Sequence, residues 1–311
     1  NDYIYIDNTN GNPTFNGTIE FKGMKTDIAS QPISESNYED YANLGGLPKY
    51  RILNNSDTSG LDFSSIASEY QTNLQNMVKP YSDLQTTPAT PTGIKFDFDN
   101  DITLSFNHDT GSDYDLLIYE GSNTANSTVR YKIKWKTSGP PNATVIKETY
   151  TKQMDDKWIW QRDFQVDTLF NGVISAKKNI IIDGDSTLSK YYGNYTLYSE
   201  KDIYIKDRLI PYDTYNQYFK NNQAQVLNDS DIESIRKYVL ANEKSSLNLV
   251  AKNNVIVSET NGNKLSNTKL FASIYAFNGS FKVENYDKGN KSAGQLLVFG
   301  SIMQNIRGPV G

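Results

Sequence analysis

The chain contains no cysteine and a single histidine, His108, among its 311 residues. The absence of cysteine excludes thiolate nucleophiles, Cys-ligated zinc and iron–sulfur clusters. One histidine excludes any site that needs two imidazole ligands, and a Ser-His-Asp hydrolase would depend on that single residue. The net charge of −5 argues against nucleic acid as a partner, because domains that bind it are usually basic. These absences favour a protein that acts by contact rather than by catalysis.

Long apolar runs are also missing from the sequence. No run approaches the roughly 20 residues that a helix needs to span a bilayer, so we expect no direct membrane insertion of this chain. No signal peptide heads the sequence, and its first residues already have the pattern of a strand. We therefore expect the chain to be a piece of a longer protein.

Asparagine and aromatic residues are present in excess. The chain has 34 Asn, 22 Tyr, 13 Phe and 3 Trp. Asparagine favours turns and tolerates the left-handed backbone region, and tyrosine offers an apolar face with a polar rim. Together they predict a turn-rich β protein with many aromatic side chains at or near its surface.

An internal repeat is the strongest pattern in the chain. Each unit has a strand that ends in a small residue, a tight turn, and a second strand of alternating apolar residues. The units are residues 174–182, 197–205, 249–257 and 274–283, and a shorter fifth unit begins at Val298. Their starts lie 23, 52, 25 and 24 residues apart, so one interval contains a long insertion.

The turn of each unit carries a residue that accepts a positive φ, namely Asn179, Asp202, Asn254 or Gly279. The alternation after the turn places every second side chain on one buried face. Stacked units of this kind predict an all-β fold, a parallel β-helix (solenoid), in which residues 1–311 form a single binding domain. The alternative is a set of ordinary hairpins with coincidental similarity.

Two insertions interrupt the repeat, at residues 36–92 and 208–246. The first contains apolar residues at helical spacing around residues 64–78. The second contains an aromatic loop and then the polar segment 229–231, whose apolar continuation predicts a capped amphipathic helix. We expect long loops and short helices here, one of them covering the open side of the β-helix.

Metal-binding and catalytic motifs are weak. Asp97, Asp99 and Asp101 resemble the start of a calcium loop, but Ile102 and His108 stand where an EF-hand needs glycine and glutamate. His108 lies in a polar turn and is expected to be a solvated loop residue. No nucleophile elbow occurs, and the exposed positions of the repeat show no cluster of acids. We expect no enzyme activity, no cofactor and no metal site.

Three aromatic clusters remain as candidates for binding. Trp158 and Trp160 lie on one side of a predicted strand, and residues 211–219 interleave rings with polar residues and are expected to be exposed. Tyr131 and Trp135 share a strand face, which core packing explains better. Sugar rings stack on exposed aromatic rings, and exposed aromatic patches mark binding surfaces. The candidate carbohydrate-binding residues are Tyr212, Tyr215, Tyr218, Phe219, Trp158, Trp160 and Trp135.

The C-terminal stretch KLFASIYAFNGSFKVEN (residues 269–285), followed by GQLLVFGSIMQNIRGPVG (residues 294–311), resembles the end of surface proteins encoded beside type IV pilus genes. Among these it is most similar to the tāpirins, non-catalytic cellulose-binding adhesins of thermophilic plant-degrading bacteria. The resemblance implies the C-terminal domain of such a protein, with a β-helix core and long loops that bind crystalline cellulose through exposed aromatics. It is specific over residues 269–311 and compositional elsewhere.

We therefore expect an extracellular, cell-surface adhesin domain that attaches the cell to crystalline cellulose or plant biomass. Its partner would be cellulose or another insoluble polysaccharide, with type IV pilus components as further candidates. Two alternatives stay open. One is a pilus-associated structural or assembly protein, and the other is a β-helix polysaccharide lyase or hydrolase.

Overall fold

The computed structural model divides the chain into two compact units, Asn1–Ser68 and Glu69–Gly311, and each is described by itself. Up to residue 52 the structure describes only the backbone of seven short strands. It then describes residues 63–84, 90–109, 111–122, 124–136, 142–154, 156–184, 188–258, 267–284 and 294–306, with side chains from residue 67 onward.

The first unit contains short, mostly parallel strand pairs. Strands β1 (Ile4–Ile6), β4 (Met24–Thr26) and β5 (Pro32–Ile33) form one sheet. Strand β2 (Thr14–Phe15) pairs with β6 (Asn43–Leu44), and β3 (Ile19–Phe21) pairs with β7 (Tyr50–Ile52).

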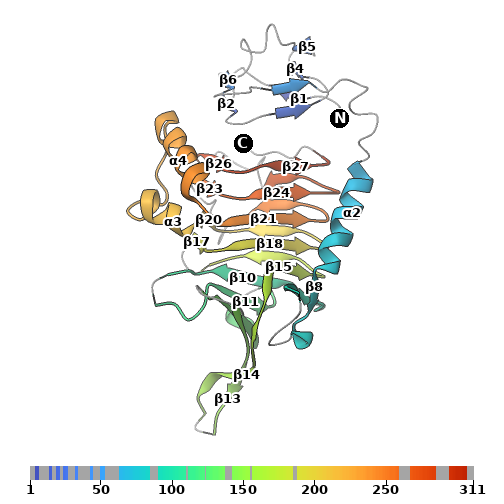
Figure 1. Cartoon of the computed structure of the whole chain (residues 1–311), viewed down its shortest axis with the longest axis vertical. Coiled ribbons are helices and arrows are strands. Elements are labelled where there is room, and N and C mark those ends of the chain that lie inside the picture. The colour runs from blue at the N-terminus through green and yellow to red at the C-terminus, as the bar shows by residue number, and fades with distance from the viewer. Residues whose placement is uncertain are drawn as a thin grey trace. The chain divides into compact units, whose positions relative to one another are not determined.

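Three larger sheets make up the second unit. The first is parallel throughout, and its strands lie one above the other (Figure 1). In order they are β8 (Val78–Pro80), β9 (Thr92–Phe96), β15 (Phe170–Ala176), β18 (Asn194–Ser199), β21 (Ser246–Ala251), β24 (Ser273–Ala276) and β27 (Ile302–Gln304). The third sheet is also parallel, in the order β17 (Leu188–Tyr191), β20 (Arg208–Pro211), β23 (Thr268–Leu270) and β26 (Leu296–Val298).

The second sheet is mixed. Its parallel part contains β10 (Ile102–Phe106), β16 (Ile180–Ile182), β19 (Ile203–Ile205), β22 (Val255–Val257) and β25 (Phe281–Val283). Its other part is an antiparallel meander that continues from β10 through β11 (Leu116–Glu120), β12 (Val129–Trp135), β13 (Ala143–Lys152) and β14 (Trp158–Thr168). The hairpin of β13 and β14 projects away from the parallel strands (Figure 1).

The predicted fold class, an all-β parallel β-helix (solenoid), is wrong. The protein is mostly β, with 48% strand and 18% helix, and the second of its main sheets mixes parallel and antiparallel pairing. The physical reason lies between β10 and β15, where the chain leaves the repeat for four successive antiparallel strands. Their alternating polar and apolar residues suit a sheet with one solvated face, which antiparallel pairing allows.

The alignment of the first four repeat units is confirmed by the strand register. Ile174 lies opposite Leu197, Leu197 opposite Leu249, and Leu249 opposite Ile274. The fifth unit was placed wrongly, because Ile302, not Val298, pairs with Ile274. Residues 296–298 instead form β26 of the third sheet.

The turn residues of the repeat serve a purpose other than the predicted one. In the described part of the chain, a positive φ outside glycine occurs only at Asp156 and Asn267, so the expected left-handed turns are wrong. The side chains form a ladder instead, in which each Oδ1 accepts a hydrogen bond from a backbone N–H of the next unit. The three steps are Asp202 N to Asn179 Oδ1 at 3.1 Å, Asn254 N to Asp202 Oδ1 at 2.8 Å, and Ser280 N to Asn254 Oδ1 at 3.1 Å.

Glycine at position 279 is explained by this ladder rather than by backbone freedom. A Cβ atom built on Gly279 would lie 2.3 Å from Asn254 Oδ1, so any larger residue would displace the last acceptor. The ladder and the apolar columns beside it hold successive units in register.

Both helices predicted in the insertions are confirmed. Helix α2 (Phe63–Asn76) packs on the first sheet of the second unit through Tyr70, whose ring stacks 5.7 Å from that of Tyr275. Helix α4 (Asp229–Asn242) begins at Asn228, whose side chain forms a capping box with Asp231. Residues 208–211 form β20, so the second insertion begins later than predicted, with α3 (Tyr212–Thr214) and the π-helical turn η4 (Tyr215–Phe219).

Candidate functional site

The projecting hairpin is a long exposed element of the second unit. Strands β13 and β14 pair over ten positions, with a bulge between Lys147 and Glu148. The turn closes through a hydrogen bond from Gln153 N to Lys157 O at 2.7 Å, and Asp156 adopts a φ of 62° there. A carboxylate residue tolerates this left-handed conformation better than most residues do. The paired strands and the closed turn therefore hold the side chains of the hairpin in fixed positions.

Four aromatic rings follow one another on the outward face of the meander. Trp158 stacks on Tyr150 with centroids 5.3 Å apart, and Tyr150 lies 5.0 Å from Trp160. Trp160 in turn meets Tyr119 edge-on at 6.1 Å. We call these four residues the ring row. It links β14, β13 and β11, and each ring rests on the next.

The ring row is only partly covered. Trp158 is 53% exposed, and the other three rings are half-buried. Beside it, Met154 at the tip of the hairpin is fully exposed. Large apolar side chains left open to solvent in one place indicate a contact surface.

Basic side chains border the ring row. The Arg130 guanidinium carbon lies 4.1 Å from the centroid of a Trp160 ring, within the range of a cation–π contact. Arg130 Nε also donates to Glu148 Oε2 at 2.6 Å, while Lys132 Nζ lies 3.3 Å from Glu148 Oε1. Glu148 is buried beneath the two cations, so it orients both of them.

Two of the predicted binding residues, Trp158 and Trp160, thus lie together in the ring row. Tyr150, Tyr119 and Arg130 were missed by the sequence analysis. The signal that could have found Tyr150 is the register of the hairpin, since Tyr150 lies directly opposite Trp160. The register can be predicted only once the residues of the turn are known, and the bulge between Lys147 and Glu148 changes the pairing of the residues farther from the turn.

Trp135 belongs to a different environment. Its ring packs 5.4 Å from Phe170 and 5.7 Å from Tyr195, and its indole N–H donates to the Tyr195 hydroxyl. Alternation along β12 places Trp135 on the face opposite Arg130. Trp135 therefore closes the core rather than extending the ring row.

The predicted aromatic cluster in residues 212–219 is divided between the surface and the core. Phe219 is completely buried and packs 6.1 Å from Phe271, so its predicted exposure is wrong. The physical reason is that α3 and η4 coil the segment and turn Phe219 toward the third sheet. Tyr218 is half-buried against Tyr238, at 5.4 Å. Tyr212 and Tyr215 are half-buried beside other partners.

Tyr212 and Tyr215 lie near the only histidine. The ring of His108 stacks on that of Tyr192 with centroids 4.4 Å apart. It also makes a T-shaped contact with the ring of Tyr212, with centroids 4.5 Å apart and the ring planes at 87°. Lys190 Nζ lies 5.1 Å from the centroid of the Tyr215 ring. These rings form a second aromatic cluster, separate from the ring row.

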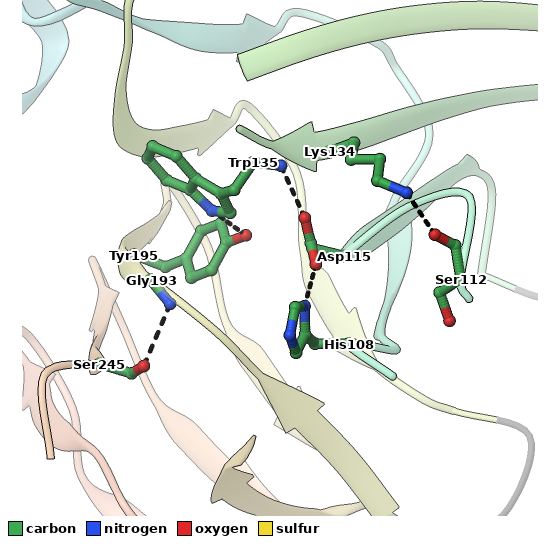
Figure 2. A network of polar contacts seen from close by, with 8 residues as sticks. All are labelled: His108, Ser112, Asp115, Lys134, Trp135, Gly193, Tyr195 and Ser245. Atoms are coloured by element: carbon green, nitrogen blue, oxygen red, sulfur yellow. Dashed lines mark hydrogen bonds and ion pairs between the residues drawn. The ribbon is translucent and has the colours of Figure 1, made fainter. Parts of the chain in front are cut away.

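His108 is held in place by a carboxylate (Figure 2). Its Nδ1 contacts Asp115 Oδ1, and Asp115 Oδ2 accepts a hydrogen bond from Trp135 N at 2.6 Å. The His108 side chain is 26% exposed and that of Asp115 is 5% exposed, so the predicted solvated histidine is wrong. The buried carboxylate ties the loop between β10 and β11 to the end of β12, which gives the pair a structural role.

Within the described residues, no group of three or more His, Asp or Glu side chains is placed to hold a metal ion. Asp101 instead starts the ladder, because its Oδ1 accepts from Asn179 N at 3.2 Å. No helix in the part that the structure describes is long and apolar enough to cross a membrane.

Comparisons with protein-family models, with curated proteins and with solved structures give no match to this chain. The similarity of its C-terminal stretch to tāpirins stays a prediction.

Proposed function

We propose that this chain binds a polysaccharide without cleaving it, and that it does so at the cell surface as part of an adhesin. The observation that carries the proposal is the ring row. Pyranose rings present C–H faces that pack against aromatic side chains, and tryptophan and tyrosine combine a large apolar area with a polar edge. A linear series of such rings suits a polymer better than a small solute.

The angles between successive ring planes indicate whether the row suits a crystal surface or a single glycan chain. Successive ring planes are inclined by 26°, 38° and 64° from Trp158 to Tyr119. A flat crystal face would require coplanar rings, whereas a single chain can follow rings that turn. Cellulose or another plant polysaccharide is the expected ligand, and soluble chains belong in the test beside microcrystalline cellulose.

Adsorption to microcrystalline cellulose and affinity electrophoresis in gels with soluble glycans test the proposal. Trp158→Ala combined with Trp160→Ala should abolish retention, because this pair supplies the exposed end and the centre of the row. Tyr204→Ala is the matched control, since Tyr204 is a half-buried tyrosine of the same sheet, on strand β19. Retention of the control and loss in the double variant support the proposal.

Wild-type protein that binds none of the glycans would overturn the proposed function. Release of reducing ends or unsaturated products from a bound glycan would contradict the non-cleaving part, and would favour a lyase or hydrolase. Retention by a pilin subunit, with no binding to glycans, would favour a pilus-associated role.

A further inference from the structure

We infer that the polysaccharide bound at the ring row carries carboxylate groups, as a uronate-containing chain does. This inference rests on the proposed function and adds the chemical class of the ligand. It is argued from the charges that share the outward face of β12, β13 and β14 with the rings.

Basic side chains outnumber acidic ones on this face. Alternation and strand register place six cations and two carboxylates on it. The cations are Arg130, Lys132, Lys134, Lys136, Lys152 and Arg162, and the carboxylates are Glu148 and Asp167. The whole chain carries a net charge of −5, so the excess of positive charge is a local property of this face.

Both carboxylates are already engaged. Glu148 contacts Arg130 and Lys132, as described above, and Asp167 Oδ2 lies 2.6 Å from Lys136 Nζ. Lys152 Nζ also lies 2.5 Å from Asp156 Oδ1 in the hairpin turn. Lys134 and Arg162 are thus the cations of this face with no carboxylate of the described residues within ion-pair distance, and positive charge stays in excess on the face. A ligand that approaches the ring row meets a surface of net positive potential, which attracts an anionic chain.

Arg162 is the cation best placed to meet that ligand. It lies directly opposite Glu148 in the register and two residues from Trp160 on the same strand face. The side chain is exposed, and no acidic residue of the described chain lies within ion-pair distance of it. A guanidinium presents a fork of N–H donors that matches a carboxylate in bidentate geometry.

Arg130 supplies a second guanidinium at the same point of the row. Because it lies over Trp160 and is fixed by Glu148, it loses little side-chain freedom when a ligand arrives. Arg130 lies over the Trp160 ring, and Arg162 follows Trp160 by two residues on the same strand face. A sugar held on the exposed rings beside them would lie near both cations, and a carboxylate there would be neutralised where a hydroxymethyl group would gain far less.

The test compares two polymers that differ in the carboxylate alone. Polygalacturonate and its carboxyl-reduced neutral form are titrated against the wild-type chain at low ionic strength, and the dissociation constants are compared. We expect polygalacturonate to bind at least tenfold more tightly, and its affinity to fall as salt is added. Arg162→Gln should weaken binding of polygalacturonate by about tenfold, the size expected for a charge-assisted hydrogen bond. Its effect on binding of the neutral polymer should be several times smaller.

Lys237→Gln provides the matched control, because Lys237 is an exposed cation on helix α4, away from the ring row. Melting temperatures of both variants should stay close to that of the wild type. Arg162 has no ion-pair partner among the described residues, and Lys237 loses only an exposed pair with Glu233, which contributes little to stability. Equal affinity for the charged and neutral polymers would overturn the inference while leaving the proposed function standing. Binding of neither polymer, nor of cellulose, would overturn both, and tighter binding of duplex DNA than of polygalacturonate would also contradict the inference.

Discussion

Removal of the Asn254 side chain is the sharpest test of the ladder that joins the repeat units. Asn254 Oδ1 accepts from Ser280 N at 3.1 Å, and Asn254 Nδ2 donates to Asp202 Oδ1 at 2.9 Å. Asn254 Oδ1 also accepts a longer bond from Ser280 Oγ at 3.5 Å. Asn254→Ala abolishes these side-chain contacts but keeps the backbone bond from Asn254 N to Asp202 Oδ1.

The expected loss in stability follows from the two shorter bonds, to Ser280 N and to Asp202 Oδ1. A neutral hydrogen bond contributes about 1 kcal/mol net, and one to a charged group contributes about 1.5–3 kcal/mol. Asn254 is half-buried, so water replaces part of what is lost. We expect the free energy of unfolding to fall by about 2 kcal/mol, which corresponds to a drop in melting temperature of roughly 4–8 °C.

Urea denaturation measures the loss, and hydrogen exchange at the Ser280 amide locates it. Asn253→Ala is the matched control, because Asn253 is also half-buried and only its backbone is bonded in the described structure, to Lys201 O at 3.0 Å. We expect the control to change stability by less than about 0.5 kcal/mol. Equal effects of the two substitutions, or an unchanged exchange rate at Ser280, would refute the ladder as a source of stability.

Three further predictions concern buried groups and close backbone contacts. Burial raises the pKa of Tyr191 well above its ordinary value of 10.0. Around and above pH 10 the unfolded chain therefore loses a proton that the folded chain keeps, and the free energy of unfolding should decrease as pH rises. Tyr191→Phe should make this decrease smaller in urea titrations at pH 9–11. Asp115→Asn should lower stability by about 1–3 kcal/mol, because it removes the charge that holds His108, and thermal unfolding at neutral pH checks it. Gly172→Ala should destabilise far more than Gly121→Ala, although both have a positive φ, since a Cβ at Gly172 would lie 1.9 Å from a backbone oxygen and one at Gly121 meets nothing within 4 Å.

Local patterns predicted much of the fold. The strand register of four repeat units follows from apolar positions that recur beside a small residue, as at Ile174 and Leu197, and the helix after Asn228 follows from its capping residues. The spacing rule failed at Val298 because the chain there belongs to another sheet. The pairing of the meander was not predicted, because its successive strands are joined by loops of different lengths and share no repeated pattern that would fix their register.

The candidate site was predictable only in part. Trp158 and Trp160 were predicted together because residues two positions apart in a strand lie on the same face. Phe219 was misplaced because a π-helical turn gives a periodicity that neither a loop nor an α-helix predicts. Tyr150 and Arg130 come from other strands, so their meeting with Trp160 could not be read from any one segment.

Tryptophan fluorescence during titration with a polysaccharide tests the central claim most directly, because the chain has only three tryptophans and two of them lie in the ring row. The proposal predicts a saturable change in emission and reduced quenching by acrylamide when polygalacturonate or a cellulose oligosaccharide binds the wild type. Trp158→Phe combined with Trp160→Phe leaves only Trp135, which packs against Phe170 and Tyr195, and the change should vanish. A titration that leaves wild-type emission unchanged while the glycan is bound, or a change of equal size in the double variant, would contradict binding at the ring row.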